Sequence, residues 1–197
     1  MNLEVEAKFQ FNDLAALRRR LLAAGGVLKK ERVFEKNTVY DDQQQSLKNN
    51  RQLIRLRQDE TVKLTFKGPP PAGFESEAKV REEIELEVSD FDKMEQIIGH
   101  LGYQPAIVYE KYRETVMLNK VEVVLDELPY GNFIELEGDE AAIKMVADRL
   151  DINWDNRINS NYLALFEKTK LAYNLTFSDL TFANFAGLEI EWGKITN

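Results

Sequence analysis

The chain has 197 residues, which is enough for one sizeable hydrophobic core, and no Ser/Gly-rich linker divides it. It contains no Cys and a single His, so disulfides, thiolate nucleophiles and Cys-based metal sites are excluded. Chemistry is left to carboxylates, Lys, Arg and any metal that they hold. The formal net charge of -8 argues against a nucleic-acid partner, because such partners are met by a basic field.

No apolar run approaches the roughly 20 residues that a membrane-spanning helix needs, and the N-terminus opens directly into a charged strand. We therefore expect a cytoplasmic protein with no membrane partner. His100 lies near the end of a predicted helix, just before Gly102. We expect it to be a surface residue and assign it no catalytic role.

Three segments, 12–24, 89–101 and 139–150, place apolar residues at helical spacing and are predicted to be amphipathic helices. The first begins with Asn12 or Asp13 as its N-cap, a position that favours short polar side chains.

Eight further segments alternate apolar and polar residues and are predicted to be strands. They are residues 3–11, 33–41, 51–58, 61–67, 80–88, 106–118, 121–127 and 132–138. Most strands follow another strand directly, which favours an antiparallel sheet or barrel over a doubly wound parallel sheet.

An apolar-Glu-apolar-Glu strand runs into a helical stretch three times. Because strand side chains alternate between faces, each repeat places two carboxylates on one face. The acid pairs are Glu4 and Glu6, Glu85 and Glu87, and Glu135 and Glu137. Paired carboxylates on a sheet suit a hard divalent cation.

Two strands carry only basic residues on their charged faces, Arg55 and Arg57 on one and Lys63 and Lys67 on the other. One interpretation is an ordinary solvated outer face of a sheet packed on helices. Surfaces selected for solubility usually mix the two signs, however. If the sheet closes, its apolar faces point outward to the helices, and the interior has room for one small ligand. Bases and acid pairs in that interior would suit a polyanion and its metal.

At these residues the chain resembles the CYTH family, the triphosphate tunnel metalloenzymes that include class IV adenylyl cyclases and thiamine or inorganic triphosphatases. The leading motif is Glu4-Val5-Glu6-Ala7-Lys8. Further motifs follow in order: Val39-Tyr40-Asp41, Ile54-Arg55-Leu56-Arg57, Thr65-Phe66-Lys67-Gly68-Pro69, Arg81-Glu82-Glu83-Ile84-Glu85, Glu110-Lys111-Tyr112-Arg113, Leu125-Asp126-Glu127-Leu128, Gly131-Asn132-Phe133-Ile134-Glu135-Leu136-Glu137 and Ser160-Asn161-Tyr162-Leu163.

The resemblance implies an α+β fold, a closed antiparallel eight-stranded β-barrel with amphipathic helices packed outside. It covers residues 1–168, which we expect to form the tunnel domain. Residues 169–197 form a C-terminal extension whose aromatic residues are more numerous than a free tail should carry. We expect the extension to dock on the barrel or on a partner subunit, as in a homodimer.

The family pattern assigns roles to individual residues. Substrate phosphates are expected at Lys8, Arg55, Arg57, Lys63, Lys67, Arg81, Lys111 and Arg113. For Arg81, neutralisation of neighbouring carboxylates is an equal alternative. Mg²⁺ or Mn²⁺ is expected at Glu4, Glu6, Glu83, Glu85, Asp126, Glu135 and Glu137. The internal repeat favours Glu87 over Glu83, but the family register favours Glu83. The expected catalytic residues are Glu4, Glu6, Lys8, Glu135 and Glu137.

The expected partner is a small-molecule triphosphate. Hydrolysis of the terminal phosphate of tripolyphosphate, thiamine triphosphate or a nucleotide needs only the phosphate-binding Lys and Arg residues, a metal and water. A class IV adenylyl cyclase would instead direct the ribose 3'-hydroxyl at the α-phosphorus of ATP and release cyclic AMP and pyrophosphate. A third alternative is a noncatalytic module that binds polyphosphate or nucleotides.

Two positions depart from the family pattern, since Val39 stands where an aromatic residue is common and Asn37 where an acid is frequent. These changes are expected to alter the tunnel mouth without abolishing the phosphate site. Residues 68–79 combine prolines at their start with a later glycine. They are either a lid over one tunnel mouth or a plain hairpin connection.

Overall fold

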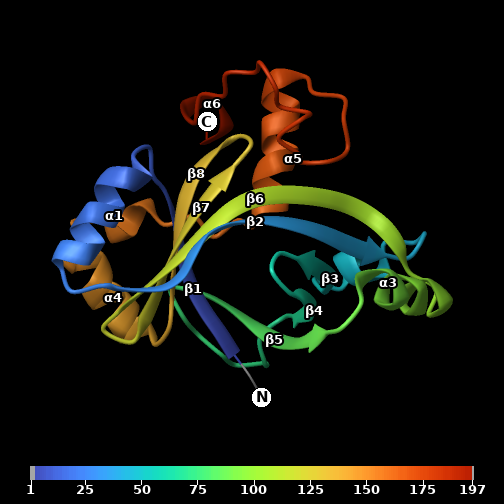
Figure 1. Cartoon of the computed structure of the whole chain (residues 1–197), viewed down its shortest axis with the longest axis horizontal. Coiled ribbons are helices and arrows are strands. Elements are labelled where there is room, and N and C mark those ends of the chain that lie inside the picture. The colour runs from blue at the N-terminus through green and yellow to red at the C-terminus, as the bar shows by residue number, and fades with distance from the viewer. Residues whose placement is uncertain (1–2, 197) are drawn as a thin grey trace.

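The computed structural model describes residues 3–196, and its eight strands close into one antiparallel barrel with helices outside (Figure 1). The strands are β1 (Leu3–Gln10), β2 (Val27–Asp41), β3 (Leu53–Gln58), β4 (Val62–Gly68), β5 (Lys79–Val88), β6 (Gln104–Leu118), β7 (Val121–Leu128) and β8 (Gly131–Glu137). Their order around the barrel is β1-β5-β4-β3-β2-β6-β7-β8. The predicted fold class is confirmed.

Strand β2 begins at Val27, six residues before the predicted start. Its pairing with β6 is irregular between Leu28 and Lys30 and again between Lys30 and Val33. Such irregularities interrupt the alternation of side chains between the two faces, which is the signal that predicts a strand. The long β2 and β6 arch together across the molecule in Figure 1.

Helices were predicted at three of the places where they occur, α1 (Leu14–Ala23), α3 (Phe91–His100) and α4 (Glu140–Arg149). Each has an aspartate N-cap, Asp13, Asp90 or Asp139, whose side chain accepts a backbone N–H of the first turn. The unpredicted helices are α2 (Ser46–Asn49), η1 (Trp154–Asn156), α5 (Tyr162–Tyr173) and α6 (Gly193–Thr196). Sequence reasoning missed α5 because its apolar residues do not keep to one helical face.

Apolar side chains pack between the barrel and its outer helices, in three clusters. Helices α1 and α4 pack on one side of the barrel wall, where Leu17 and Ile143 are fully buried. Helix α3 packs on the opposite side with Ile98. The C-terminal helices cover a third side, around Phe133 and Phe166. Because the apolar faces of the strands meet these helices, the charged faces point into the barrel.

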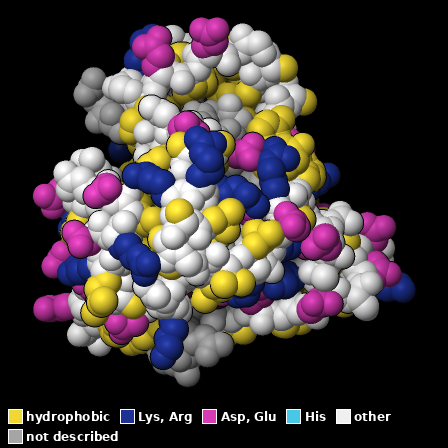
Figure 2. All heavy atoms as spheres, turned by 60° about the vertical axis from the view of Figure 1, so that its left-hand side comes forward, with side chains coloured by type: hydrophobic (Ala, Val, Ile, Leu, Met, Phe, Trp, Pro, Cys, Tyr) yellow, Lys and Arg dark blue, Asp and Glu magenta, His cyan; other side chains and the backbone are white. Residues whose placement is uncertain are grey.

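The outer surface mixes charges of both signs. On the face shown in Figure 2, Lys and Arg side chains lie near the middle, whereas Asp and Glu lie mainly toward the edges, with apolar side chains between them.

Within residues 3–196, no helix is both long and apolar enough to cross a membrane. Helix α5 runs across residue 168, so the proposed domain division there stays a prediction.

Candidate functional site

A cavity of about 380 Å³ lies inside the barrel and receives side chains from all eight strands and from the start of α5. Its basic residues are Lys8, Lys29, Lys30, Arg55, Arg57, Lys63, Lys67, Lys79, Arg81, Lys111 and Arg113. Its acidic residues are Glu4, Glu6, Glu35, Glu83, Glu85, Glu122, Glu135 and Glu137. Eleven basic against eight acidic side chains give the cavity a formal excess of three positive charges. The whole chain, in contrast, has a net charge of -8.

Fourteen of the fifteen predicted site residues line this cavity, and Asp126 lies behind it. The structure therefore brings the predicted residues together, while their roles stay predictions.

Three carboxyl groups, those of Glu4, Glu6 and Glu137, form a cluster in which one oxygen from each lies within 4.8 Å of the others. Glu6 and Glu137 are direct cross-strand neighbours of β1 and β8, and Glu4 precedes Glu6 on the same face. Burial, and then the neighbouring carboxylates, raise the pKa of Glu137 to about 8 against the opposing effect of Arg113. A site that disfavours its own negative charge in this way fits a cation, and carboxylate oxygens are the ligands that Mg²⁺ prefers.

Two lysines of the cavity wall contact the same acid cluster. Lys67 Nζ lies 2.6 Å from Glu4 and 3.0 Å from Glu83, and Lys79 pairs with Glu6. Among residues 3–196, Glu137 has no such ion pair. Glu137 is therefore the carboxyl group of the cluster that makes no ion pair with a Lys or Arg of the described residues.

The other predicted metal ligands on β7 and β8 are already paired. Glu135 lies 3.2 Å from Lys8 and 2.7 Å from Arg113, both measured between charged atoms. Burial alone would raise the pKa of Glu135, but Lys8 and then Arg113 hold it well below its usual range. Asp126 is completely buried and accepts hydrogen bonds from Lys111, Arg113 and Tyr162. With these contacts, Asp126 is better suited to hold the side chains of Lys111 and Arg113 in place than to bind a metal.

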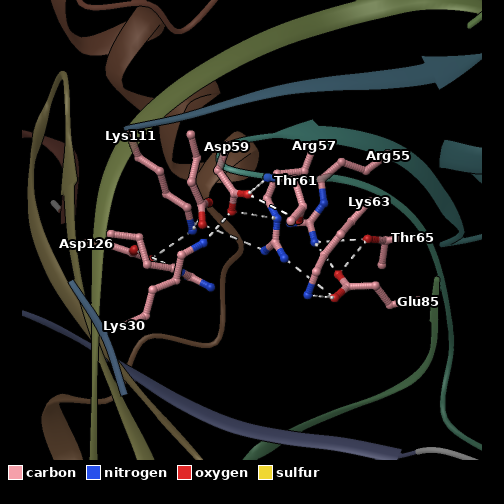
Figure 3. Close-up of polar contacts among 12 residues, drawn as sticks. Lys30, Arg55, Arg57, Asp59, Thr61, Lys63, Thr65, Glu85, Lys111 and Asp126 are labelled. Atoms are coloured by element: carbon pink, nitrogen blue, oxygen red, sulfur yellow. Dashed lines mark hydrogen bonds and ion pairs between the residues drawn. The ribbon is translucent and has the colours of Figure 1, made fainter. Parts of the chain in front are cut away.

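The opposite wall carries the two arginines of β3, each 9% exposed. Figure 3 shows Arg55, Arg57 and Lys63 converging with Glu85 inside the barrel. Arg57 lies 3.5 Å from Glu85, and Lys63 lies 2.9 Å from the same carboxylate. The Nε atoms of Arg55 and Arg57 have no hydrogen-bond partner within the described chain. Both Nε atoms are buried within the wall, and that of Arg57 lies 3.7 Å from Asp59 Oδ2.

Arg81 also makes hydrogen bonds to the backbone that the sequence did not predict, while its proposed role toward phosphate or carboxylates stays a prediction. Its Nη2 donates to the carbonyl oxygens of Arg51 at 2.6 Å and Lys67 at 3.2 Å, and its Nε donates to that of Gly68 at 3.2 Å. Burial lowers its pKa. Arg81 therefore holds the end of β4 in place, although it also lines the cavity.

Sequence reasoning missed several cavity residues that two-residue alternation could have found. Glu35 and Lys79 lie two positions before Asn37 and Arg81, and Tyr109 lies two before Lys111. Asp59 follows β3 and does not line the cavity, but its carboxylate accepts a hydrogen bond from Lys30 Nζ at 2.7 Å (Figure 3). Only the structure shows this contact, because Lys30 lies at the distant start of β2.

The two departures from the family pattern lie on the inner side of β2. Asn37 is fully buried, and neither polar atom of its side chain has a hydrogen-bond partner in the described chain. Val39 lines a second cavity of about 840 Å³. His100 is exposed at the end of α3 and lines neither cavity.

The second cavity adjoins the first, since both are lined by Leu53, Arg81 and Leu163. Pro69 and Pro70, at the start of the proposed lid, form part of its wall.

The later part of the same loop is hydrogen-bonded to α4 and η1. Ser76 Oγ donates to Glu140 at 2.6 Å, and Glu77 accepts from Trp154 Nε1 at 2.9 Å. Residues 72–75 lie between these contacts and the prolines.

The chain matches the CYTH domain family over residues 2–170, and it belongs to that family. A provisionally named adenylate cyclase of Methanocaldococcus jannaschii is 28% identical over 175 residues, covering 83% of this chain and 98% of that protein.

Two solved structures share the fold. One, a provisionally named adenylate cyclase from Vibrio parahaemolyticus, has a TM-score of 0.74 at 18% identity, over 84% of this chain and 98% of that chain. The other, from Hippeastrum, is described as a provisional adenylyl cyclase with a dominant triphosphatase activity. It has a TM-score of 0.60 at 16% identity, over 85% of this chain and 95% of that chain.

Proposed function

We propose that this protein is a divalent-metal-dependent enzyme that hydrolyses the terminal phosphate of a triphosphate. One observation carries the proposal: a chain with a net charge of -8 encloses a cavity with a formal excess of three positive charges. Such an excess in a buried space attracts a compact polyanion. Membership of the CYTH domain family supports a triphosphate as that polyanion.

The basic wall would replace the water that a triphosphate loses on entering the barrel. Charge-assisted hydrogen bonds from Arg and Lys are strong where the surroundings have a low dielectric constant. Arg55 and Arg57 are well placed for this role, because both line the cavity from β3. Lys63 and Lys67 complete this wall from β4.

On the acidic side, Glu4, Glu6 and Glu137 would hold Mg²⁺ or Mn²⁺, since their oxygens already lie within 4.8 Å of one another. When bound, the metal supplies Lewis-acid activation of the phosphoryl group and of the attacking oxygen. Glu135 and Lys8 would act beside this cluster, because their ion pair holds the end of β8 against β1. Glu83, Glu85 and Asp126 would mainly orient the neighbouring cations.

The second cavity favours an alternative, a class IV adenylyl cyclase. Cyclisation of ATP requires that the base and ribose be held beside the phosphate chain, and a space of about 840 Å³ adjoins the charged cavity. Apolar residues such as Pro105 and Ile107 and polar residues such as Gln52 and Asn159 line this space. The same wall would also accommodate the organic part of a substrate for hydrolysis.

A product-resolving assay tests the proposal. Tripolyphosphate, thiamine triphosphate and ATP are each incubated with the protein and Mg²⁺ or Mn²⁺, and phosphate, pyrophosphate and cyclic AMP are separated. Release of phosphate supports hydrolysis, whereas cyclic AMP and pyrophosphate in equal amounts support the cyclase. Binding of the triphosphates without turnover under any metal would contradict both and leave a noncatalytic binding module.

A further inference from the structure

The C-terminal segment pairs with an edge of the barrel that β7 leaves open. Strand β6 spans Gln104–Leu118, but its pairing with β7 begins only at Tyr112. Leu180 occupies the free edge before that point: its N–H donates to the Val108 carbonyl at 2.9 Å, and its carbonyl accepts the Glu110 N–H at 2.9 Å. This segment lies beyond residue 170, where the family match ends.

Two side chains reinforce this pairing from opposite directions. Asp179 Oδ1 accepts the Val108 N–H at 2.8 Å, and Glu110 Oε2 accepts the Phe182 N–H at 2.9 Å. Both chain neighbours of Tyr109 are therefore held by the C-terminal segment. Leu180 is completely buried in the same apolar cluster that contains Tyr109.

Tyr109 in turn holds a cation of the cavity. Its side chain is only 6% exposed, and its hydroxyl oxygen accepts a hydrogen bond from Arg55 Nη1 at 3.0 Å. The second amino group of Arg55 donates to Thr65 Oγ1 at 3.2 Å. These two neutral contacts set the orientation of the guanidinium, because its nearest carboxylate, that of Glu85, lies 3.7 Å away.

We propose that residues 179–182 are a positioning element for phosphate binding: they fix the backbone on both sides of Tyr109, and Tyr109 fixes Arg55. The inference rests on the proposed function, in which Arg55 meets substrate phosphate. A guanidinium already held in its binding orientation loses less side-chain freedom when phosphate binds. The segment therefore raises phosphate affinity without contacting the substrate.

The test compares variants in their affinity for tripolyphosphate, measured by titration calorimetry with the full-length protein. Asp179→Ala removes the side-chain acceptor of the Val108 N–H and should weaken binding about three- to tenfold, the loss expected when one ordered side chain is released. Asp179→Asn keeps an acceptor oxygen and should bind as the unaltered protein does. Lys194→Ala, which removes an exposed ion pair with Glu191 in the same C-terminal region, is the matched control and should have no effect.

A double-mutant cycle distinguishes positioning from a general structural role. Tyr109→Phe removes only the hydroxyl that holds Arg55, so Asp179→Ala should cause little further loss of affinity in the Tyr109→Phe background. Equal losses in both backgrounds, or no loss from Asp179→Ala in either, would overturn the inference and leave the proposed function standing. If the unaltered protein does not bind tripolyphosphate, the proposed function fails as well.

Discussion

Glu135 and Glu137 lie on the same face of β8, two residues apart, yet they face opposite charges across the strand pair with β1. Glu135 is the direct neighbour of Lys8, and Glu137 is the direct neighbour of Glu6. As a result the pKa of Glu135 is held well below its usual range, whereas that of Glu137 is raised to about 8. Glu135 thus forms an internal ion pair, whereas Glu137 belongs to the acid cluster that we propose as the metal site.

The first prediction concerns Glu137→Gln in the absence of metal. Because the pKa of this carboxyl is raised from 4.5 to about 8, its ionisation at higher pH opposes folding. The variant should therefore be more stable than the unaltered protein at pH 8 to 9 and indistinguishable from it near pH 4. Thermal unfolding in excess chelator across this pH range measures the difference.

The same variant should lose the stabilisation that Mg²⁺ gives to the unaltered protein, because one of three cluster oxygens no longer carries charge. Glu31→Gln, at an exposed position of β2 that does not line the cavity, is the control and should keep the response. An equal shift in melting temperature for both variants on addition of Mg²⁺ would place the metal elsewhere.

Arg57→Ala should weaken binding of tripolyphosphate and ATP by similar factors, because the guanidinium meets phosphate rather than base. Loss of one charge-assisted contact costs about 1.5–3 kcal/mol, or roughly ten- to a hundredfold in affinity. Arg19→Ala makes the same charge change on the exposed side of α1 and should leave both affinities unchanged. A loss confined to ATP would assign Arg57 to a base-binding pocket instead.

Glu35→Gln should destabilise the fold in a pH-dependent way. Burial disfavours the charge of Glu35, but Lys111 and further cations lower its pKa from 4.5 to about 2. A lowered pKa contributes stability above the unfolded value of 4.5 that is lost as the pH falls toward 2. The deficit of the variant, at most about 3 kcal/mol at neutral pH, should shrink across that window.

Chemical denaturation at a series of pH values measures this deficit. Glu31→Gln, at an exposed position of the same strand, is the matched control and should show no comparable trend. A deficit for Glu35→Gln that stays constant between pH 7 and pH 3 would mean that the interior cations do not depend on this carboxylate.

Residues 72–75 should become protected from hydrogen exchange when metal and a nonhydrolysable triphosphate bind, if the loop acts as a lid. Prolines before them line the second cavity and Ser76 is tied to Glu140, so only this short part is free to close. Helix α3, on the outer side of the barrel wall, is the internal reference. Unchanged exchange at saturating ligand would leave a plain hairpin connection.

The barrel was predictable because its strands alternate apolar and charged residues without interruption, as in Val5 and Glu6 or Leu136 and Glu137. The bulged start of β2 and helix α5 lack such a pattern and were missed. The unequal states of Glu135 and Glu137 could not be predicted, because they depend on the register between β1 and β8. A shift of that register by two residues would place Glu137 opposite Lys8 and Glu135 opposite Gln10.

The same dependence changes the choice of variant for probing the metal site. From the sequence, Glu135 and Glu137 are equivalent, and replacing both should abolish turnover without harming the fold. In the structure, removal of Glu135 takes away the carboxylate that pairs with the buried Lys8 and leaves Arg113 with Asp126 alone. Glu4 and Glu137 are therefore the better probes of the metal site.

Phosphorus NMR of triphosphate turnover tests the central claim most directly. The unaltered protein and Glu137→Gln are each followed with tripolyphosphate and ATP in Mg²⁺ and then in excess chelator. We expect metal-dependent conversion by the unaltered protein that stops in chelator, and little or none by Glu137→Gln. Undiminished conversion in excess chelator, or full activity of Glu137→Gln in Mg²⁺, would contradict the account of a metal-dependent triphosphate site inside the barrel.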